Sequence, residues 1–212
     1  MAAVPTTPKG IRTRTQILAA ARRVFARSGY VNATMSAIAE ESGLSLGGLY
    51  RYFGNKEDVF ESLIGDIHDE LYQASGRTAH DFRTDAYAAL LDANRGYLEH
   101  YHANRDVMRA LIEAANVDAR FRDVWFRMRE RHVDRFVTAL AEHHGIDTVG
   151  GQSARLMAEA AACMVEQSAY VWYAHEKLRA QTVPLADAAV IVTQAWHNLF
   201  FADAPEFAPA GD

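Results

Sequence analysis

The sequence predicts an all-α protein of about nine helices. Apolar residues recur every three or four positions through most of the 212 residues, which is the spacing of one face of an α-helix. No segment alternates apolar and polar residues convincingly with the period of a β-strand. Half of the residues are hydrophobic and only 5 are proline, so these helices can bury a sizeable core.

The first predicted helix lies within residues 14–29 and begins after Arg14. Ile17, Ala21 and Val24 mark its apolar face, and the arginines of the segment lie on the other side. Gly29 suits the C-terminal cap, because glycine adopts the left-handed conformation without a steric penalty. We therefore expect an amphipathic helix that ends at this glycine.

Two short helices follow over residues 34–43 and 45–54, joined by the sequence SGLS. Thr34 or Ser36 can cap the first of them, and Ser45 can cap the second. Two short helices with a glycine-containing turn are typical of a helix-turn-helix. Any tight helical hairpin would show the same spacing, so the pattern alone leaves both interpretations open.

Six further helices account for most of the remaining chain. Asn55 caps the fourth helix, and Pro184 opens the ninth. Asp118 and Gly145 bound the seventh helix, and the clearest loop of the chain covers residues 145–153. The six predicted helices cover residues 55–75, 83–102, 104–116, 118–145, 152–178 and 184–202.

Charge divides the chain into two parts near residue 56. Residues 1–56 contain eight Lys and Arg residues against two acidic ones, whereas the remainder contains 14 against 25. A basic end on an acidic body suggests a polyanion as the partner of that end. A basic face that simply contacts solvent would give the same count.

The composition argues against several classes of protein. The one cysteine, Cys163, cannot form an intrachain disulfide. No apolar stretch is long enough to span a membrane. The N-terminus lacks the apolar centre of a signal peptide. We therefore expect a cytoplasmic protein with no membrane partner. The nine histidines lack the spacing of metal ligands, and no nucleophile or phosphate-loop motif is present, so we expect neither an enzyme nor a bound cofactor or metal.

A longer ordered match runs from about Thr15 to Phe60. Its sequence ILAAARRVFARSGYVNATMSAIAEESGLSLGGLYRYFGNKEDVF resembles the TetR family of one-component transcriptional regulators. The resemblance implies a helix-turn-helix DNA-binding domain over residues 1–56, with residues 1–10 as a flexible arm, and a ligand-binding and dimerisation domain over residues 57–212. It also implies a double-stranded DNA operator, a homodimer and a small effector molecule.

The predicted recognition helix, residues 45–54, carries two adjacent glycines. Gly47 and Gly48 cost helix stability, but they let the backbone approach bases and phosphates closely. Easier packing within the chain is the alternative reason for them. Leu49 and Phe53 are four residues apart, and we expect both side chains to face the core.

Because these glycines have no side chains to contact bases, recognition of the DNA sequence would depend on a few other residues and on DNA shape. Arg51 is the candidate for a bidentate contact to guanine. Arg12 and Arg14 precede the first predicted helix and would add salt-sensitive affinity from the arm. The resemblance implies phosphate contacts by Tyr50, Tyr52 and Lys56, although Tyr52 could equally be a half-buried ring. The predicted DNA-contacting residues are Thr34, Ser36, Ser45, Gly47, Gly48, Tyr50, Arg51, Tyr52 and Lys56.

Aromatic side chains recur at helical spacing in the predicted body. Tyr97 and Tyr101 are four residues apart, as are His132 and Phe136. Such stripes form a packed core more often than a pocket. In proteins of the TetR family, however, the fourth to seventh helices enclose a ligand cavity and the last two helices pair with a second subunit. The dimer contacts expected on that basis are Met164, Val171, Ile191 and Phe200.

Two C-terminal stretches, MVEQSAYVWYAHE and IVTQAWHNLFF, also resemble the mycobacterial ethionamide-activation repressor, whose pocket is a long aromatic tunnel. This resemblance implies a small hydrophobic or amphipathic effector. Arg129 and His132 add polarity that would suit a carboxylate or carbonyl at one end of it. The ligand-binding residues implied by position are Leu90, Asn94, Tyr97, Tyr101, Trp125, Arg129, His132, Phe136, Val165, Ala169, Tyr170 and Trp196.

The predicted function is a ligand-responsive transcriptional regulator. Repression is the usual mode of the family, in which a dimer binds a palindromic operator and the effector releases it. A DNA-binding regulator without a small-molecule ligand would have the same sequence features. A helical enzyme is the alternative from another class, and it would need a convergent set of catalytic groups that the spacing does not offer.

Overall fold

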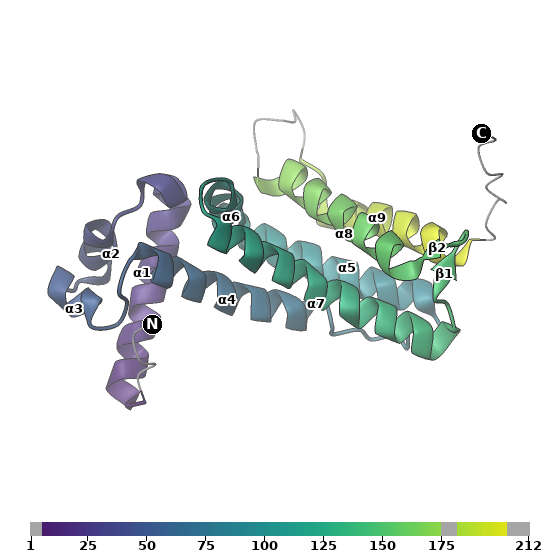
Figure 1. Ribbon diagram of the computed structural model, residues 1–212, viewed down its shortest axis with the longest axis horizontal. Helices are drawn as coiled ribbons and strands as arrows, with labels where there is room; N and C mark the ends of the chain where they lie inside the picture. Colours follow the sequence, from purple (N-terminus) through teal and green to yellow (C-terminus); the bar gives the residue numbers. More distant parts are fainter. Residues whose placement is uncertain (1–5, 175–181, 203–212) are drawn as a thin grey trace. The chain divides into compact units, whose positions relative to one another are not determined.

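The computed structural model describes residues 6–174 and 182–202, and within them it forms nine α-helices and one two-stranded hairpin (Figure 1). The prediction of an all-α fold with nine helices is confirmed for these residues. The chain divides into two compact units. Unit 1 comprises Met1–Asp69 and Asn104–Trp125, and unit 2 comprises Glu70–Ala103 and Phe126–Asp212. Two helices, α4 (Lys56–Ala74) and α7 (Ala119–His144), contribute residues to both units.

Unit 1 begins with α1 (Pro8–Asn32), which is longer than predicted. Arg12 and Arg14 lie inside this helix, so these arginines do not belong to a flexible arm. The Arg14 guanidinium donates a hydrogen bond to the Ser62 hydroxyl, which ties it to α4. The first five residues of the predicted arm lie outside the described residues.

Gly29 interrupts α1 where a C-terminal cap was predicted. Its φ of 70° and ψ of −177° fall in a region that glycine alone occupies without strain. A Cβ at this position would also collide with the carboxylate of Glu113. The glycine therefore allows both a sharp bend of the chain and the close approach of that carboxylate, after which one more turn ends at Asn32.

The helix-turn-helix consists of α2 (Met35–Ser42) and α3 (Leu46–Tyr50). Thr34 and Ser45 cap these two helices, because their hydroxyls accept the backbone N–H groups of Ala37 and Gly48 at 3.1 Å each. The predicted caps are therefore confirmed. The second helix is shorter than the predicted 45–54, since the chain turns at Arg51 and Tyr52.

The next helix, α4 (Lys56–Ala74), begins after Asn55, whose side-chain oxygen accepts the Asp58 N–H at 2.7 Å as predicted. Later in the chain, α6 (Arg105–Val117) and the first turns of α7 (Ala119–His144) complete unit 1. Four aromatic rings form the centre of this unit, with neighbouring ring centroids 4.6 to 5.2 Å apart. These rings belong to Phe25, Tyr30, Phe60 and Phe121.

Unit 2 is built from α5 (Ala86–Ala103), the greater part of α7, α8 (Ala154–Ala169) and α9 (Leu185–Phe201). Helix α9 packs against both α5 and α8. Small side chains cover the buried face of α8. A buried hydrogen bond of 2.9 Å from the Asn94 amide to the Thr193 hydroxyl joins α5 to α9.

Two local features of unit 2 differ from the prediction. The predicted loop contains a short hairpin of β1 (Thr148–Val149) and β2 (Gln152–Ser153), which turns through two glycines with positive φ. Helix α8 continues as one π-helical turn, η1 (Tyr170–Ala174). The last residues of the predicted helix, 175–178, lie outside the described residues. None of the helices described is long and apolar enough to cross a membrane.

Candidate DNA-binding surface and ligand cavity

The residues of α3 divide between the core and solvent as predicted. Leu49 and Phe53 are buried, which confirms their expected place in the core. Tyr50 is 49% exposed, and Arg51 is exposed at the end of the helix. The aromatic and basic side chains of this segment are therefore available to a molecule outside the chain.

Gly47 lies on the exposed side of α3 near its N-terminus. A Cβ built at Gly47 would meet no heavy atom within 4 Å, so the packing of the chain does not require glycine there. At Gly48 a Cβ would come within 3.2 Å of the Ser45 hydroxyl oxygen, which is part of the cap of α3. Packing thus explains Gly48 in part, whereas it gives no reason for Gly47.

Lys56 has close partners inside unit 1. Its ammonium donates to the carbonyl oxygens of Tyr30 at 2.9 Å and Val31 at 3.2 Å, and it lies 4.6 Å from the centre of the Tyr30 ring. A phosphate contact by this residue would have to share the ammonium with those carbonyls. The other predicted DNA-contacting residues are exposed or half-buried: Thr34, Ser36, Ser45, Gly47, Tyr50 and Arg51 are exposed, and Gly48 and Tyr52 are half-buried.

Part of the basic charge of unit 1 is matched within the chain. The Glu41 carboxylate accepts hydrogen bonds from Arg23 at 2.6 Å and from Arg27 at 3.4 Å. The Arg23 bond, together with that from Arg27, holds the pKa of Glu41 below its usual value. One of the two acidic residues within residues 1–56 is therefore placed against the basic side chains of α1.

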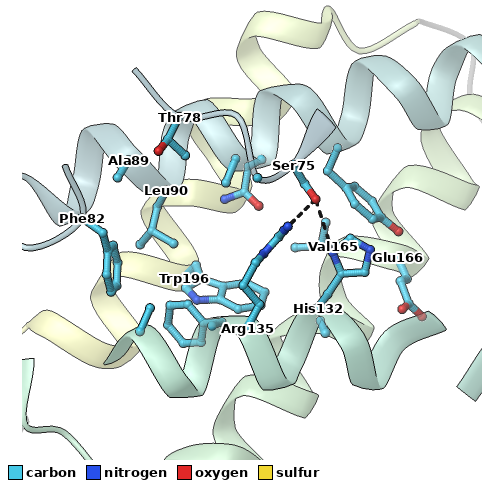
Figure 2. Close-up of a pocket in the computed structure, with 17 residues that line it drawn as sticks. Ser75, Thr78, Phe82, Ala89, Leu90, His132, Arg135, Val165, Glu166 and Trp196 are labelled. Carbon is cyan, nitrogen blue, oxygen red and sulfur yellow. Dashed lines mark hydrogen bonds between the residues drawn. The ribbon is translucent and has the colours of Figure 1, made fainter. Parts of the chain in front are cut away.

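Unit 2 contains a cavity of about 260 Å³ among α5, α7, α8, α9 and the segment that follows α4 (Figure 2). Its lining is mostly aromatic and aliphatic, with a few polar groups, which is the usual character of a small-molecule site. The lining residues are Ser75, Gly76, Thr78, Phe82, Ala89, Leu90, Ala93, Asn94, Tyr97, His132, Arg135, Phe136, Ala139, Ala162, Val165, Glu166 and Trp196.

Seven of the twelve predicted ligand residues line this cavity. They are Leu90, Asn94, Tyr97, His132, Phe136, Val165 and Trp196. Trp125 belongs to unit 1, whereas the cavity lies in unit 2. Tyr101, Arg129, Ala169 and Tyr170 belong to unit 2 but are not among the lining residues.

Arg129 has a partner that the sequence did not reveal. Its guanidinium forms three hydrogen bonds of 2.6 to 3.1 Å with the Glu166 carboxylate, and the two side chains are only 17% and 18% exposed. The hydrogen bond to Glu166 raises the pKa of Arg129. The charge of Arg129 is therefore matched inside the protein, and the prediction that it supplies the polar end of the pocket is not supported by this geometry.

Arg135, which sequence analysis passed over, lines the cavity instead. It reaches from α7 to the C-terminal end of α4, where Nη1 donates to the Tyr72 carbonyl and Nη2 to the Ser75 hydroxyl, both at 2.7 Å (Figure 2). The same hydroxyl lies 3.3 Å from Nδ1 of His132. A helical projection of α7 could have placed Arg135 near His132, since i+3 residues share a face.

The four predicted dimer residues fall into different environments. Ile191 and Met164 are 53% and 38% exposed, and Val171 is half-buried. Phe200 is 5% exposed, because its ring packs 4.9 Å from that of Phe136 within the same chain. Phe200 is therefore part of the core of unit 2 rather than of an outer face.

The N-terminal segment matches a known protein family. Residues 17–63 fit the family model described as bacterial regulatory proteins, tetR family. This segment includes the buried part of α1, both helices of the helix-turn-helix and the start of α4. The match to the tetR model therefore lies in unit 1 and spans its helix-turn-helix.

Curated relatives are similar over the same part of the chain. The HTH-type regulator YfiR of Bacillus subtilis is 42% identical over 59 residues, or 28% of this chain and 29% of YfiR. The repressor AcnR of Corynebacterium efficiens is 42% identical over 60 residues, covering 28% and 32%. The regulator HbdR of Aromatoleum is 32% identical over 102 residues, covering 43% and 44%. The chain thus spans less than half the length of these relatives.

Solved structures extend the similarity to the whole fold. A TetR-like regulator from Rhodococcus sp. RHA1 matches 88% of this chain and 95% of its own, with a TM-score of 0.66 and 23% identity. A TetR-family regulator from Streptomyces coelicolor matches 94% and 92%, with a TM-score of 0.71 and 18% identity. The fold is therefore that of TetR-like proteins.

Together these findings show a match to the tetR model over residues 17–63 and a fold like that of TetR-like structures. The relatives are regulators rather than enzymes. In the described part of the chain, no three His, Cys, Asp or Glu side chains cluster as metal ligands would. The resemblance to the ethionamide-activation repressor is not shown by these comparisons.

Proposed function

We propose that the protein is a ligand-responsive transcriptional repressor that binds a palindromic operator as a homodimer. One combination of features carries this proposal. An exposed recognition helix lies in the segment that fits the tetR model, and a separate cavity of about 260 Å³ lies in unit 2. The cavity favours a regulator that binds a ligand over one that does not. The cytoplasm, where such an operator would lie, is the expected location.

DNA binding would use the exposed side of α3. Arg51 and Tyr50 are exposed beside Gly47, where the backbone has no side chain in front of it. We expect Arg51 to contact a base edge in the major groove and the tyrosines to contact phosphates. Two such helices of a dimer would read half-sites about 34–36 Å apart or somewhat more.

Release from DNA requires that the effector bind the DNA-incompetent state more tightly than the other state. The apolar lining of the cavity suits a small hydrophobic or amphipathic molecule. Repression is favoured over activation because the similar protein AcnR is named a repressor.

Dimerisation would use the outer faces of α8 and α9. Four large apolar side chains on these helices, Leu156, Met164, Val190 and Ile191, are 38% to 59% exposed. A second copy would remove them from water. We expect Ile191→Glu to produce monomers in sedimentation velocity, whereas the wild-type chain sediments as a dimer.

The test is selection of genomic DNA fragments by the purified protein at two salt concentrations. Recovery of one palindrome, with affinity that falls steeply as salt rises, would support the proposal. Failure to recover any fragment from protein that mass spectrometry shows to be empty of ligand would contradict it. Arg51→Ala serves as the matched variant and should abolish the selection without unfolding the chain.

A further inference from the structure

We propose that the effector is an amphipathic carboxylate whose carboxylate group pairs with Arg135. This inference rests on the proposed function, because it names the chemistry of the molecule that the cavity takes. It is carried by the surroundings of one guanidinium group in unit 2. Arg135 lines the cavity, and no carboxylate of the described residues lies within salt-bridge distance of it.

Arg135 is held in place by neutral groups. Its two hydrogen bonds within the described residues go to a backbone carbonyl and to a hydroxyl, and its guanidinium carbon lies 4.3 Å from the centre of the Tyr72 ring. Gly76 makes room for it, because a Cβ there would come within 2.8 Å of Nη1. An arginine has five N–H donors, so this arrangement orients the group and leaves donors for another acceptor.

The positive charge at this position is reinforced by a second arginine. Arg131, one turn earlier on α7, places its guanidinium carbon 4.4 Å from the centre of the same Tyr72 ring. Burial and the charge of Arg131 both act to lower the pKa of Arg135. An arginine remains protonated in a protein despite such a shift, so the cation is held where water solvates it poorly.

The nearby acidic residues do not neutralise Arg135. Glu166, on the cavity wall, is bound to Arg129, and Asp134 is bound to Arg155. Glu142 lines an adjoining surface hollow together with Arg135 but lies beyond salt-bridge distance. An anion from outside the chain would therefore be the close counter-charge that the described residues do not provide.

The rest of the cavity suits an apolar body. Phe82, Leu90 and Ala89 lie at the end away from His132 and Glu166 (Figure 2). Trp196 adds one further polar group, because its buried indole N–H has no hydrogen-bond partner among the described residues. An oxygen-bearing molecule is thus favoured over a hydrocarbon. A cavity of about 150 Å³ takes benzene, so 260 Å³ would take roughly ten non-hydrogen atoms.

The experiment compares carboxylates with alcohols of the same chain length. Hexanoate, octanoate and decanoate, and the corresponding 1-alkanols, are titrated into the ligand-free protein in a calorimeter. We expect the best carboxylate to bind the wild-type chain about tenfold or more tightly than its alcohol, which is the scale of a hydrogen bond to a charged group. Equal affinity of acid and alcohol, or no binding by any carboxylate, would overturn the proposal.

Three variants assign the preference to Arg135. Arg135→Gln should reduce the acid-to-alcohol ratio to near one, and Arg135→Lys should retain part of it. Arg127→Gln makes the same charge change on the exposed side of α7 and should leave the ratio unchanged. Because the ratio is taken within one variant, a loss of folded protein affects both ligands alike. An unchanged ratio in Arg135→Gln would refute the assignment.

Operator binding gives a separate readout for the proposed function. A ligand-free chain that binds no DNA would contradict the regulator proposal whatever the calorimetry shows. A chain that binds its operator but does not distinguish octanoate from 1-octanol would contradict only the carboxylate inference.

Discussion

The carboxylate of Glu113 caps the backbone at Tyr30, 83 residues earlier in the chain. Oε2 accepts the Tyr30 N–H at 2.9 Å, and Oε1 accepts the Val31 N–H at 3.1 Å. These amides follow the break at Gly29, so the preceding turn of α1 does not supply them with acceptors. A side chain of α6 therefore completes the end of α1.

Removing this cap should destabilise the protein. We expect Glu113→Ala to lower the free energy of unfolding by about 1.5–3 kcal/mol, because two amides lose a charged acceptor. Glu113→Gln keeps one acceptor oxygen and should lose about half as much. Urea unfolding of the full chain measures both. Glu61→Ala, an exposed change on α4, is the control, and an equal effect of the two alanine variants would rule out the capping role.

Substitution at Gly47 should separate stability from DNA binding. Gly47→Ala fills open space in a helix, so we expect the free energy of unfolding to rise by up to about 1 kcal/mol. The added methyl group should weaken operator binding by about 1–3 kcal/mol, the usual cost of overfilling a close contact. The two measurements are urea unfolding and fluorescence anisotropy with operator DNA.

Gly65→Ala is the matched control for that experiment. Gly65 is also exposed and helical, and a Cβ there would likewise meet nothing within 4 Å. This variant should gain a similar stability and bind DNA as the wild type does. If Gly47→Ala also bound DNA normally, close approach of DNA would no longer explain the glycine.

The Arg129–Glu166 pair should show strong coupling in a double-mutant cycle. Either Arg129→Met or Glu166→Leu alone leaves one largely buried charge without its partner, and we expect a loss of about 2–4 kcal/mol for each. The double variant should recover most of that loss. Thermal and urea unfolding give the four values of the cycle. Additive losses would mean that the two side chains do not act as a pair.

Stability should fall at alkaline pH. Burial raises the pKa of the Tyr30 and Tyr101 phenols above the usual value, and the charges of Glu57 and Glu166, respectively, add to the shift. A group whose pKa is raised in the folded state stabilises fully below its unfolded pKa of about 10 and loses that contribution as pH rises further. The expected slope is at most about 1.4 kcal/mol per pH unit for each phenol.

Urea unfolding at several pH values above about 9 measures this slope. Tyr101→Phe removes one of the two phenols with little change of shape, and it should make the dependence shallower. A slope that is unchanged in this variant would show that Tyr101 is not responsible. The tyrosinate absorbance that the wild-type chain shows in excess of Tyr101→Phe should appear together with unfolding rather than before it.

Sequence reasoning succeeded where the interaction is local. Thr34, Ser45 and Asn55 each bond to an amide three residues later, so the cap can be read from the sequence without knowing the fold. Leu49 and Phe53 are both buried as expected, although α3 ends at Tyr50, because the Phe53 N–H still bonds to the Leu49 carbonyl at 3.2 Å.

It failed where the partner is distant in sequence. Arg129 and Arg135 belong to the same helix, but the sequence pointed only to Arg129 as a partner for an anion, and the charge of Arg129 is matched by Glu166. That pairing spans 37 residues and depends on how α7 and α8 pack. The π-helical turn at Tyr170 also has no local signal, because the sequence there contains no glycine or proline.

The contact between Glu113 and the end of α1 limits how such a protein can be recombined with others. The aromatic centre of unit 1 also needs Phe121, which follows α6. A hybrid made by exchanging only residues 1–69 would bring a foreign α1 to a native Glu113 and Phe121. A hybrid in which residues 104–125 are exchanged together with residues 1–69 would take the backbone amides at the end of α1 and the Glu113 carboxylate from the same parent protein.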